Sequence, residues 1–422
     1  MVKRIGIIGL GNVGEAVAHS LKKHASLISR RTGLKLEIKS LCDKEKRKRR
    51  VAERLCVPFT TQALSLIKDP DIHIIVELIG GIQPARKFIM EALRRKKNVV
   101  TANKALLATH GREIFSLAKK KKKAVGFEAS VCGAIPLIKS ISQGLVSCEV
   151  RKIYGILNGT TNYILYKMGK EKIDFAAAVA QAQKKGLAER KPYLDIEGTD
   201  TLHKLTILSY LCFGVWPSMQ KVHTEGISKI SLLDILYAEE LNYRVKLLAI
   251  AKKDRNAIDL RVHPTLIPIG HPLSETSLSY NAVFLHAYPA GQLLFYGEGA
   301  GGLPTSSSVI SDIVSISLNE KGIMRREEKL NLKNVKDVKA RYYIRFMALD
   351  RPGVLASISK ILASLKISIA SVTQKERKKG KFVPIVMLTH EAREESMRKA
   401  LAKIDHLPVI QSPSQTIRIE DL

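Results

Sequence analysis

The chain has 422 residues, of which 45% are hydrophobic, and its 70 Lys and Arg against 39 Asp and Glu give a formal net charge of +31. This length is enough for two or three domains with buried cores, and the apolar runs are too short to span a bilayer, which excludes a membrane protein. No basic segment followed by a long apolar stretch opens the chain, so we expect a cytoplasmic protein without a targeting segment.

The excess positive charge raises the question of nucleic-acid binding. Lys and Arg occur as short bursts at residues 44–50, 94–97, 119–123 and 375–381, and aromatic residues make up only 5% of the chain. Basic stretches without interleaved aromatics are not typical of a base-stacking platform. We therefore expect incidental attraction to polyanions and no specific nucleic-acid site.

The first element is an apolar strand at residues 5–8, and an amphipathic helix follows it. The connecting turn has the pattern GxGxxG, whose glycines allow a tight turn, bring a pyrophosphate close to bare backbone and let helix and strand pack closely. A strand before the motif and a helix after it favour a dinucleotide site over a glycine turn without a ligand. The expected contacts are Gly9, Gly11, Asn12, Val13 and Gly14.

The second strand, at residues 36–42, ends in Asp43. A carboxylate at this place accepts the hydroxyls of an adenosine ribose, which favours NAD. The basic residues that follow, Lys44, Lys46 and Arg47, suit the 2′-phosphate of NADP instead. The residues therefore leave the choice between NAD and NADP open.

A buried strand at 71–78, a helix at 84–96 and strands at 98–101 and 125–128 continue the alternation. This order predicts an α/β fold with a doubly wound parallel sheet, in which ligands gather at the carboxyl ends of the strands. Lys104 follows the 98–101 strand. We therefore interpret it as a lysine at the cofactor site rather than a solvated one.

The pattern changes beyond residue 130, and we place the boundary between cofactor and substrate domains there. A strand at 149–157 leads into the polar turn NGTTN at 158–162, which starts a helix. The carboxylate-rich segment 186–198 then runs into an apolar helix that begins near Thr199.

Asp200 and Lys204 lie four residues apart at the entrance to this helix, so the carboxylate can hold the ammonium on one helix face. Glu189, Asp195 and Glu197 crowd the preceding loop. A cluster of carboxylates beside a helix start suits a small substrate that carries an amine. An ordinary surface ion pair with a solvated acidic turn is the alternative interpretation.

Charged, lysine-rich sequence at 319–339 is typical of a linker, and regular patterns resume after it. The order strand, helix, strand, strand, helix, strand predicts a ferredoxin-like βαββαβ domain. The expected bounds are 342–348, 354–365, 367–374, 382–388, 394–404 and 409–417. We interpret the basic turn at 375–381 as a solvated hairpin.

Several motifs, taken in chain order, resemble those of homoserine dehydrogenases. They are GLGNVG, TANKALLA, FEASVCGAIPLI, LNGTTNYIL, GLAERKPYLDIEGTDTLHKL, TEGI, VHPTLIP and YGEGAGGLPTSSSVISDI, and they run from residue 5 to about residue 325. The loop DRPGVL at 350–355 resembles the ligand loop of ACT domains.

The resemblance implies three domains. A Rossmann-type dinucleotide-binding domain covers 1–130, with a return helix at about 305–320. An α+β catalytic and dimerisation domain covers 131–318. After the linker at 319–339, a ferredoxin-like ACT domain covers 340–422.

The resemblance also implies interconversion of L-homoserine and L-aspartate 4-semialdehyde with NAD or NADP, in threonine, methionine and isoleucine biosynthesis. Lys204 and Lys104 match the family's two active-site lysines and are expected to transfer the hydroxyl proton, with Asp200 orienting Lys204. A lysine with an ordinary pKa near ~10.4 is protonated at neutral pH, which suits this task. The expected substrate contacts are Glu189, Asp195, Asn158, Gly159 and Thr160.

Two further ligand sites follow from the same resemblance. The glycine-rich loop at 297–302 is expected to return to the cofactor through Gly301 and Gly302, the alternative being a flexible turn. A monovalent cation, usually sodium, is expected to bind the Glu128 carboxylate and backbone carbonyls, since hard cations take oxygen ligands. Those carbonyls belong to Val131, Gly133 and Ile135.

ACT domains bind amino acids at paired interfaces, so the resemblance implies feedback control, with L-threonine as the family's usual effector. The alternative is an ACT domain that only assists oligomerisation. We expect a homodimer or a homotetramer.

Three other functions stay open at this point. A nicotinamide-binding regulator with a vestigial site is disfavoured by the intact set of Glu189, Asp195, Asp200 and Lys204. A nucleic-acid-binding protein would show steep salt-dependent retention on DNA. A dehydrogenase acting on another amino-acid-like alcohol is the third. No fused aspartokinase is expected, because the chain starts at the first strand of the sheet.

Overall fold

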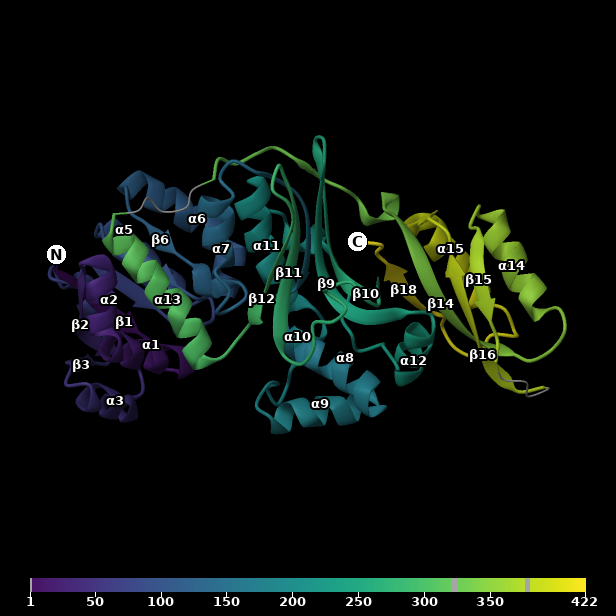
Figure 1. Ribbon diagram of the computed structural model, residues 1–422, viewed down its shortest axis with the longest axis horizontal. Helices are drawn as coiled ribbons and strands as arrows, with labels where there is room; N and C mark the ends of the chain where they lie inside the picture. The colour runs from purple at the N-terminus through teal and green to yellow at the C-terminus, as the bar shows by residue number, and fades with distance from the viewer. Residues whose placement is uncertain (1, 320–324, 376–379) are drawn as a thin grey trace. The chain divides into compact units, whose positions relative to one another are not determined.

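A computed structural model (Figure 1) describes residues 2–319, 325–375 and 380–422. The chain divides into two compact units. Unit 1 comprises Met1–Arg151, His203–Met219 and Tyr280–Lys329, and unit 2 comprises Lys152–Leu202, Gln220–Ser279 and Leu330–Leu422. Part of the expected linker at 319–339 and most of the basic turn at 375–381 lie outside the described residues.

Unit 1 contains a parallel sheet with the strand order β3-β2-β1-β4-β5-β6. The strands are β1 (Val2–Ile8), β2 (Lys35–Cys42), β3 (Phe59–Thr60), β4 (Ile74–Glu77), β5 (Asn98–Thr101) and β6 (Val125–Gly126). The order reverses between β1 and β4, which is the switch point where doubly wound sheets bind dinucleotides. The prediction of a doubly wound α/β domain is therefore confirmed.

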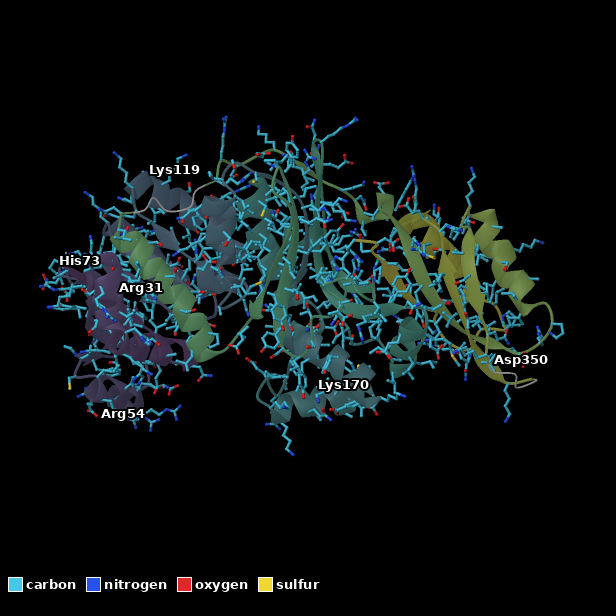
Figure 2. The ribbon with its side chains drawn as sticks, viewed as in Figure 1. Arg31, Arg54, His73, Lys119, Lys170 and Asp350 are labelled. Atoms are coloured by element: carbon cyan, nitrogen blue, oxygen red, sulfur yellow. The ribbon has the colours of Figure 1, made fainter. Side chains whose placement is uncertain are left out.

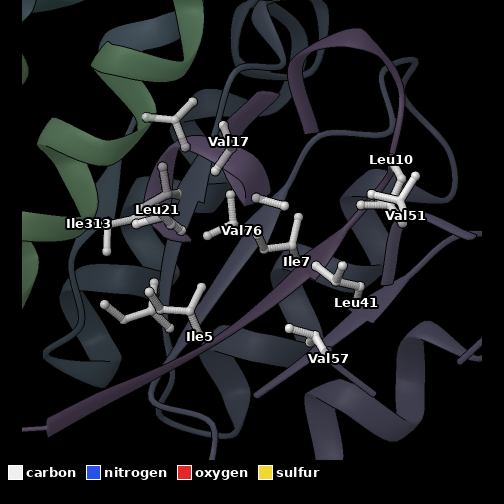
Figure 3. Packing of buried hydrophobic residues seen from close by; sticks show 14 of the residues in the cluster. Ile5, Ile7, Leu10, Val17, Leu21, Leu41, Val51, Val57, Val76 and Ile313 are labelled. Atoms are coloured by element: carbon white, nitrogen blue, oxygen red, sulfur yellow. The ribbon is translucent and has the colours of Figure 1, made fainter. Parts of the chain in front are cut away.

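The helices that accompany this sheet include one from much later in the chain. They are α1 (Asn12–Lys23), α2 (Ala25–Thr32), α3 (Arg49–Arg54), α4 (Ala63–Lys68), α5 (Ala85–Arg94), α6 (Lys104–Lys121) and α13 (Gly302–Ser317). Helix α13 lies beside α1 (Figure 1), and its Ile313 joins Val17 of α1, Ile7 of β1 and Val76 of β4 in one buried core (Figure 3). The first domain is thus completed by a helix that the chain reaches only after leaving it.

The strand predicted at 125–128 is shorter in the structure, because α13 covers its end. Gly126 has no room for a side chain, since an added Cβ would lie 2.7 Å from the Cβ of Asp312. The Asp312 carboxylate also accepts the N–H of Glu128 at 2.8 Å. Short helical turns follow, and later residues of unit 1 form an antiparallel hairpin. These elements are α7 (Leu137–Lys139), a π-helical turn (Ser140–Gly144), β11 (Tyr280–Tyr288) and β12 (Gly291–Glu298).

Unit 2 is built on long antiparallel strands. Strand β7 (Glu149–Ile156) enters from unit 1, and β9 (Tyr243–Asp254) pairs with both β7 and β10 (Ala257–Pro268), to which the short β8 (His223–Thr224) adds in parallel. Its helices are α8 (Gly159–Glu171), α9 (Phe175–Lys184), α10 (Tyr193–Ile196) and α12 (Leu232–Glu240). Helix α11 (Thr199–Phe213) starts in unit 2 and continues into unit 1.

The C-terminal part of unit 2 has the predicted βαββαβ order, with the antiparallel strand order β18-β14-β16-β15. Its elements are β14 (Lys339–Leu349), α14 (Val354–Ser364), β15 (Ile369–Thr373), β16 (Phe382–Thr389), β17 (Ala392–Arg393), α15 (Glu394–Ile404) and β18 (Gln415–Ile419). The ferredoxin-like prediction is confirmed. Within the expected linker, β13 (Asn331–Leu332) pairs with β10.

The last strand differs from its prediction at 409–417. Ile410 forms only a single bridge with Ala348, and the strand proper begins at Gln415. Pro413 lacks an N–H group and cannot donate to a ladder, which explains why pairing starts after it. Strand β18 pairs with β14 on one side and with β10 on the other, so it joins two sheets that local patterns present as separate.

The basic side chains come from many elements. Arg31 on α2, Arg54 on α3 and Lys119 on α6 are all exposed (Figure 2). Each belongs to a different helix, as expected for charge that is spread in short bursts. Within the described ranges, no helix is both long and apolar enough to cross a membrane.

Candidate active site

The glycine turn between β1 and α1 is shaped by contacts with backbone. Gly9 has φ +98°, and a Cβ there would lie 2.7 Å from the carbonyl carbon of Leu78. A Cβ on Gly14 would lie 1.9 Å from the carbonyl oxygen of Gly9, whereas a Cβ on Gly11 would meet no protein atom within 4 Å. Gly11 is thus open toward a ligand, at the N-terminus of a helix that favours anions.

Two expected cofactor contacts from distant segments lie at this turn. Asp43 follows β2, and its carboxylate accepts the N–H of Leu10 at 2.7 Å and that of Glu45 at 2.9 Å. Gly302 starts α13 and packs on the start of α1, since a Cβ there would lie 2.8 Å from the carbonyl oxygen of Asn12. Gly301, with φ +117°, makes the turn that allows this approach.

Lys104 is the first residue of α6, and a chain of polar side chains that the sequence analysis did not identify leads to it. The buried Glu77, at the end of β4, accepts a hydrogen bond from the Thr101 hydroxyl at 2.7 Å, and burial raises the pKa of this carboxyl. The Thr101 hydroxyl accepts the N–H of Asn103 at 3.0 Å, and Asn103 caps α6 by accepting the N–H of Leu106 at 3.1 Å. The start of α6 is therefore anchored to two strand ends.

Asn158 is the N-cap of α8, and its side chain brings two predicted carboxylates together. Its amide nitrogen donates to Asp195 at 2.7 Å and to Asp200 at 2.8 Å, while its amide oxygen accepts the N–H of Thr161 at 2.9 Å. Asp200 is 4% exposed and Asp195 is half-buried. A neutral donor between two carboxylates leaves their negative charge in place, as a site for an ammonium requires.

Of the other expected substrate residues, Gly159 and Thr160 belong to this turn, whereas Glu189 lies away from it. The Thr160 hydroxyl donates to the carbonyl oxygen of Leu187 at 2.7 Å, and a Cβ on Gly159 would lie 2.4 Å from the carbonyl oxygen of Ser279. Glu189 lies on the exposed segment before α10, and its backbone carbonyl accepts from Gln183 at 3.1 Å. The structure therefore groups Asn158, Asp195 and Asp200, and leaves Glu189 at the surface.

Asp200 and Lys204 both belong to α11, and both are buried, at 4% and 7% exposure. Helix α11 begins at Thr199, so Asp200 lies in the first turn, where a carboxylate interacts favourably with the helix dipole. Lys204 lies one turn further along. Burying an ammonium group is costly unless it is paired, so the place of Lys204 on the same helix as Asp200 makes it a candidate for a specific role.

The Glu128 carboxylate is buried and held by backbone. It accepts the N–H groups of Ile138 at 2.7 Å and Lys139 at 2.9 Å, and burial raises its pKa. The carbonyl groups that are expected to bind the cation lie in the loop between Glu128 and Ile138. They belong to Val131, Gly133 and Ile135.

Lys246 in β9 is a buried lysine that the sequence analysis missed. It is 4% exposed and donates to the amide oxygen of Asn162 at 3.1 Å and to the carbonyl oxygen of Thr276 at 2.5 Å. The Asn162 amide in turn donates to the carbonyl of Thr276 at 3.2 Å, which ties α8 to the segment before Ser279. Burial, and to a lesser extent the charge of Arg244, lower the pKa of Lys246 to about 7. The one sign of it in the sequence is a lysine within an apolar strand pattern.

Replacing Lys246 by methionine is expected to change how stability depends on pH. The lysine has a pKa of about 7 in the folded protein and ~10.4 when unfolded. Between these values the unfolded chain binds more protons, so the wild-type free energy of unfolding rises with pH. The full shift corresponds to on the order of 4–5 kcal/mol. Urea unfolding of both proteins at several values between pH 7 and 10 measures the effect.

The advantage of the Lys246→Met variant over wild type should accordingly shrink as pH rises through this window. Lys170→Met, which removes an exposed lysine of α8, is the matched control and should show no such trend. Parallel stability curves for wild type and Lys246→Met would contradict the expectation.

Comparisons with known proteins agree over the whole chain. A family model described as homoserine dehydrogenase matches residues 136–314, its NAD binding domain model matches 9–128, and an ACT domain model matches 342–406. The homoserine dehydrogenase of Neisseria gonorrhoeae is 40% identical over 431 residues, covering 99% of this chain and 98% of that protein. The one from Helicobacter pylori is 40% identical over 422 residues, covering 99% of both.

Two solved structures extend the comparison. The crystal structure of a homoserine dehydrogenase from Thiobacillus denitrificans has a TM-score of 0.93 and 40% identity, covering 100% of this chain and 99% of that one. A hyperthermophilic archaeal homoserine dehydrogenase in complex with NADPH has a TM-score of 0.65 and 25% identity, covering 76% of this chain and 98% of that one.

Proposed function

Because this chain belongs to the homoserine dehydrogenase family, we propose that the turn at Asn158, together with α10 and α11, binds and converts its substrate. The chain is an oxidoreductase of amino-acid biosynthesis that interconverts L-homoserine and L-aspartate 4-semialdehyde with a nicotinamide cofactor. The observation that carries the residue assignment is the Asn158 amide, which donates to Asp195 and Asp200 together.

Asp195 and Glu189 bind the ammonium group of the substrate. Asp195 is half-buried and fixed by Asn158, so its position is set before a substrate arrives. Each carboxylate oxygen accepts more than one hydrogen bond, and Asp195 can therefore bind an ammonium while it accepts from Asn158. Glu189 lies on an exposed segment and joins from the surface. Asn158, Gly159 and Thr160 line the reacting end of the substrate.

Lys204 and Lys104 transfer the proton of the substrate hydroxyl. The nicotinamide ring supplies the hydride acceptor when it is bound, so the protein itself has to position the substrate and to move one proton. Lys204 is the main candidate because it is buried on α11, one turn beyond Asp200, whose carboxylate favours an ammonium nearby. Lys104 starts α6 at the end of β5, close in sequence to the anchored Asn103.

The cofactor binds at the glycine turn of unit 1, through Gly9, Gly11, Asn12, Val13, Gly14, Gly301 and Gly302. Asp43 accepts the ribose hydroxyls of NAD, or Lys44 and its basic neighbours bind the 2′-phosphate of NADP. Arg47 already pairs with Glu45 at 2.6 Å, which leaves Lys44 and Lys46 as the exposed candidates for the phosphate. We propose that both cofactors are accepted.

A monovalent cation such as sodium binds at Glu128. The Glu128 carboxylate is buried, and together with the carbonyl oxygens of Val131, Gly133 and Ile135 it offers oxygen ligands of the hard type that such a cation prefers. The Gly133 carbonyl accepts from the Ser308 hydroxyl at 2.7 Å, which leaves it a second lone pair. The cation would be structural.

The C-terminal ACT domain binds an amino-acid effector, which we propose to be L-threonine, and the chain forms homodimers or homotetramers. Its loop from Asp350 to Gly353 precedes α14, and Gly353 has φ +86°. The Asp350 N–H donates to the carbonyl oxygen of Lys381 at 2.8 Å, so this loop is held against the neighbouring strand.

The test is an initial-rate assay at the nicotinamide absorbance band with L-homoserine, NAD+ or NADP+, sodium ions and added L-threonine. Asp195→Asn is expected to raise the KM for L-homoserine about 10- to 100-fold, because one charge-assisted hydrogen bond to the ammonium is lost. The KM for the cofactor should stay as in wild type. Asp254→Asn, which alters an exposed carboxylate at the end of β9, is the control. An unchanged KM for homoserine in Asp195→Asn would refute its role.

A further inference from the structure

We propose that the turn Glu225–Gly226–Ile227, anchored by Arg418 of the last strand, is a positioning device that holds α10 and so places the Asp195 carboxylate. Nothing in the assigned chemistry uses this turn, although it lies against the helix that carries a substrate residue. The inference rests on the proposed role of Asp195 and adds residues that set its position.

The turn and the end of α10 are in close backbone contact. The N–H of Ile227 donates to the carbonyl oxygen of Ile196 at 2.8 Å. A Cβ on Gly226 would lie 2.3 Å from that same oxygen and 2.5 Å from the Cα of Glu197. The backbones of the two segments therefore approach closely because residue 226 has no side chain. Asp195 immediately precedes Ile196 in α10.

The turn itself is fixed to the central strands of unit 2. Strand β8 pairs in parallel with β10, and the N–H of Glu225 donates to the carbonyl oxygen of Val262 at 2.8 Å. Gly198, which follows α10, has φ +81° and packs on the same strand, since a Cβ there would lie 3.1 Å from Val262. The C-terminal end of α10 and the glycine that follows it are thus both held, directly or through the turn, by β10.

Arg418 in β18 holds the side chain of the turn. Its guanidinium donates to the two carboxylate oxygens of Glu225 at 2.8 and 3.2 Å, and to those of Glu394 at 2.9 and 2.7 Å. His223 is a further neighbour, with its Nε2 atom 3.1 Å from Arg418. Arg418 is only 6% exposed. The two carboxylates accept hydrogen bonds from its planar guanidinium group in the bidentate manner that suits an arginine.

The same arginine links the turn to the C-terminal βαββαβ segment. Glu394 is the first residue of α15, and its carboxylate also accepts the hydroxyl of Tyr342 in β14 at 2.8 Å. Although burial raises the pKa of Glu394, its hydrogen bond and ion pair with Arg418 lower that pKa to about 2. The carboxylate is ionised at neutral pH, so the chain of contacts from α15 to α10 stays intact.

The experiment compares Gly226→Ala with Gly144→Ala. A Cβ on Gly144 would meet no protein atom within 4 Å, and neither glycine has a positive φ, so the two variants differ in the space around the new methyl group. Gly226→Ala is expected to raise the KM for L-homoserine at least tenfold and to leave the dissociation constant of the nicotinamide cofactor unchanged. Gly144→Ala should leave both values as in wild type.

Hydrogen exchange of the amides at 195–198 is the second readout, since these N–H groups bond within or next to α10. Faster exchange there in Gly226→Ala and in the milder Glu225→Gln variant is expected. Unchanged exchange together with an unchanged KM would overturn the proposal. If Asp195→Asn leaves the KM unaltered, the assigned substrate role fails, and the exchange data alone then decide whether the turn holds α10.

Discussion

The Lys204→Ala variant is expected to bind its nicotinamide cofactor as wild type does, and to turn over L-homoserine about 10³ times more slowly. General acid and base groups typically contribute about 10²- to 10⁴-fold to a rate. Lys204 is buried on an apolar helix, 7% exposed and one turn beyond Asp200, so water cannot easily replace it. Cofactor affinity by titration and turnover by initial rates are the two measurements.

Two further variants test whether a loss of turnover is specific to Lys204. Lys185→Ala removes an exposed lysine at the end of α9 and should leave turnover unchanged. Lys104→Ala tests the second proposed lysine. If Lys204→Ala keeps turnover within about tenfold of wild type while Lys104→Ala loses it, Lys104 is the principal proton-transfer group and the assignment of Lys204 is wrong.

Gly11→Ala is expected to lose affinity for the cofactor, whereas Gly14→Ala is expected to lose folding stability. Gly11 has φ −69° and ψ −167°, which any residue adopts, and its Cβ would meet no protein atom within 4 Å. Gly11→Ala should therefore unfold at nearly the wild-type midpoint while its cofactor affinity falls about 100-fold, because the methyl group would occupy the space that we propose for the pyrophosphate. Titration of the cofactor and urea unfolding check both values.

Gly14→Ala is the structural counterpart of this pair. Its Cβ would lie 1.9 Å from the carbonyl oxygen of Gly9, so helix and strand must separate, at a cost of about 3 kcal/mol or more. Its unfolding midpoint should fall clearly. If Gly11→Ala bound the cofactor normally, the glycine turn would have no role in holding the pyrophosphate.

Local patterns in the sequence predict most elements well. The strand at 98–101 and the helix at 394–404 have the same bounds in the structure, because each combines a regular apolar period with a clear start and stop. The last strand is displaced from 409–417 to Gln415–Ile419, because its partners β10 and β14 are distant in the chain and only pairing defines where it begins.

Some residues of the candidate site could be identified from the sequence, and others could not. Residue types and spacing identify Asp195, Asp200 and Lys204 as candidates, since a carboxylate-rich loop before an apolar helix is visible in one stretch. The Asn158 amide that joins two of these carboxylates was expected only as a lining residue. Glu77 and Lys246 were missed, because a single polar residue inside an apolar strand gives no sign of what it contacts.

The sequence by itself determined the order of the domains, the glycine turn and the family, because these depend on residues that are neighbours in the chain. Only the tertiary structure decided that β18 joins two sheets and that Arg418 and the Gly226 turn contact the segment of α10. The physical reason is that hydrogen bonds and close packing depend on distance in space, and for these contacts the partners are far apart in sequence.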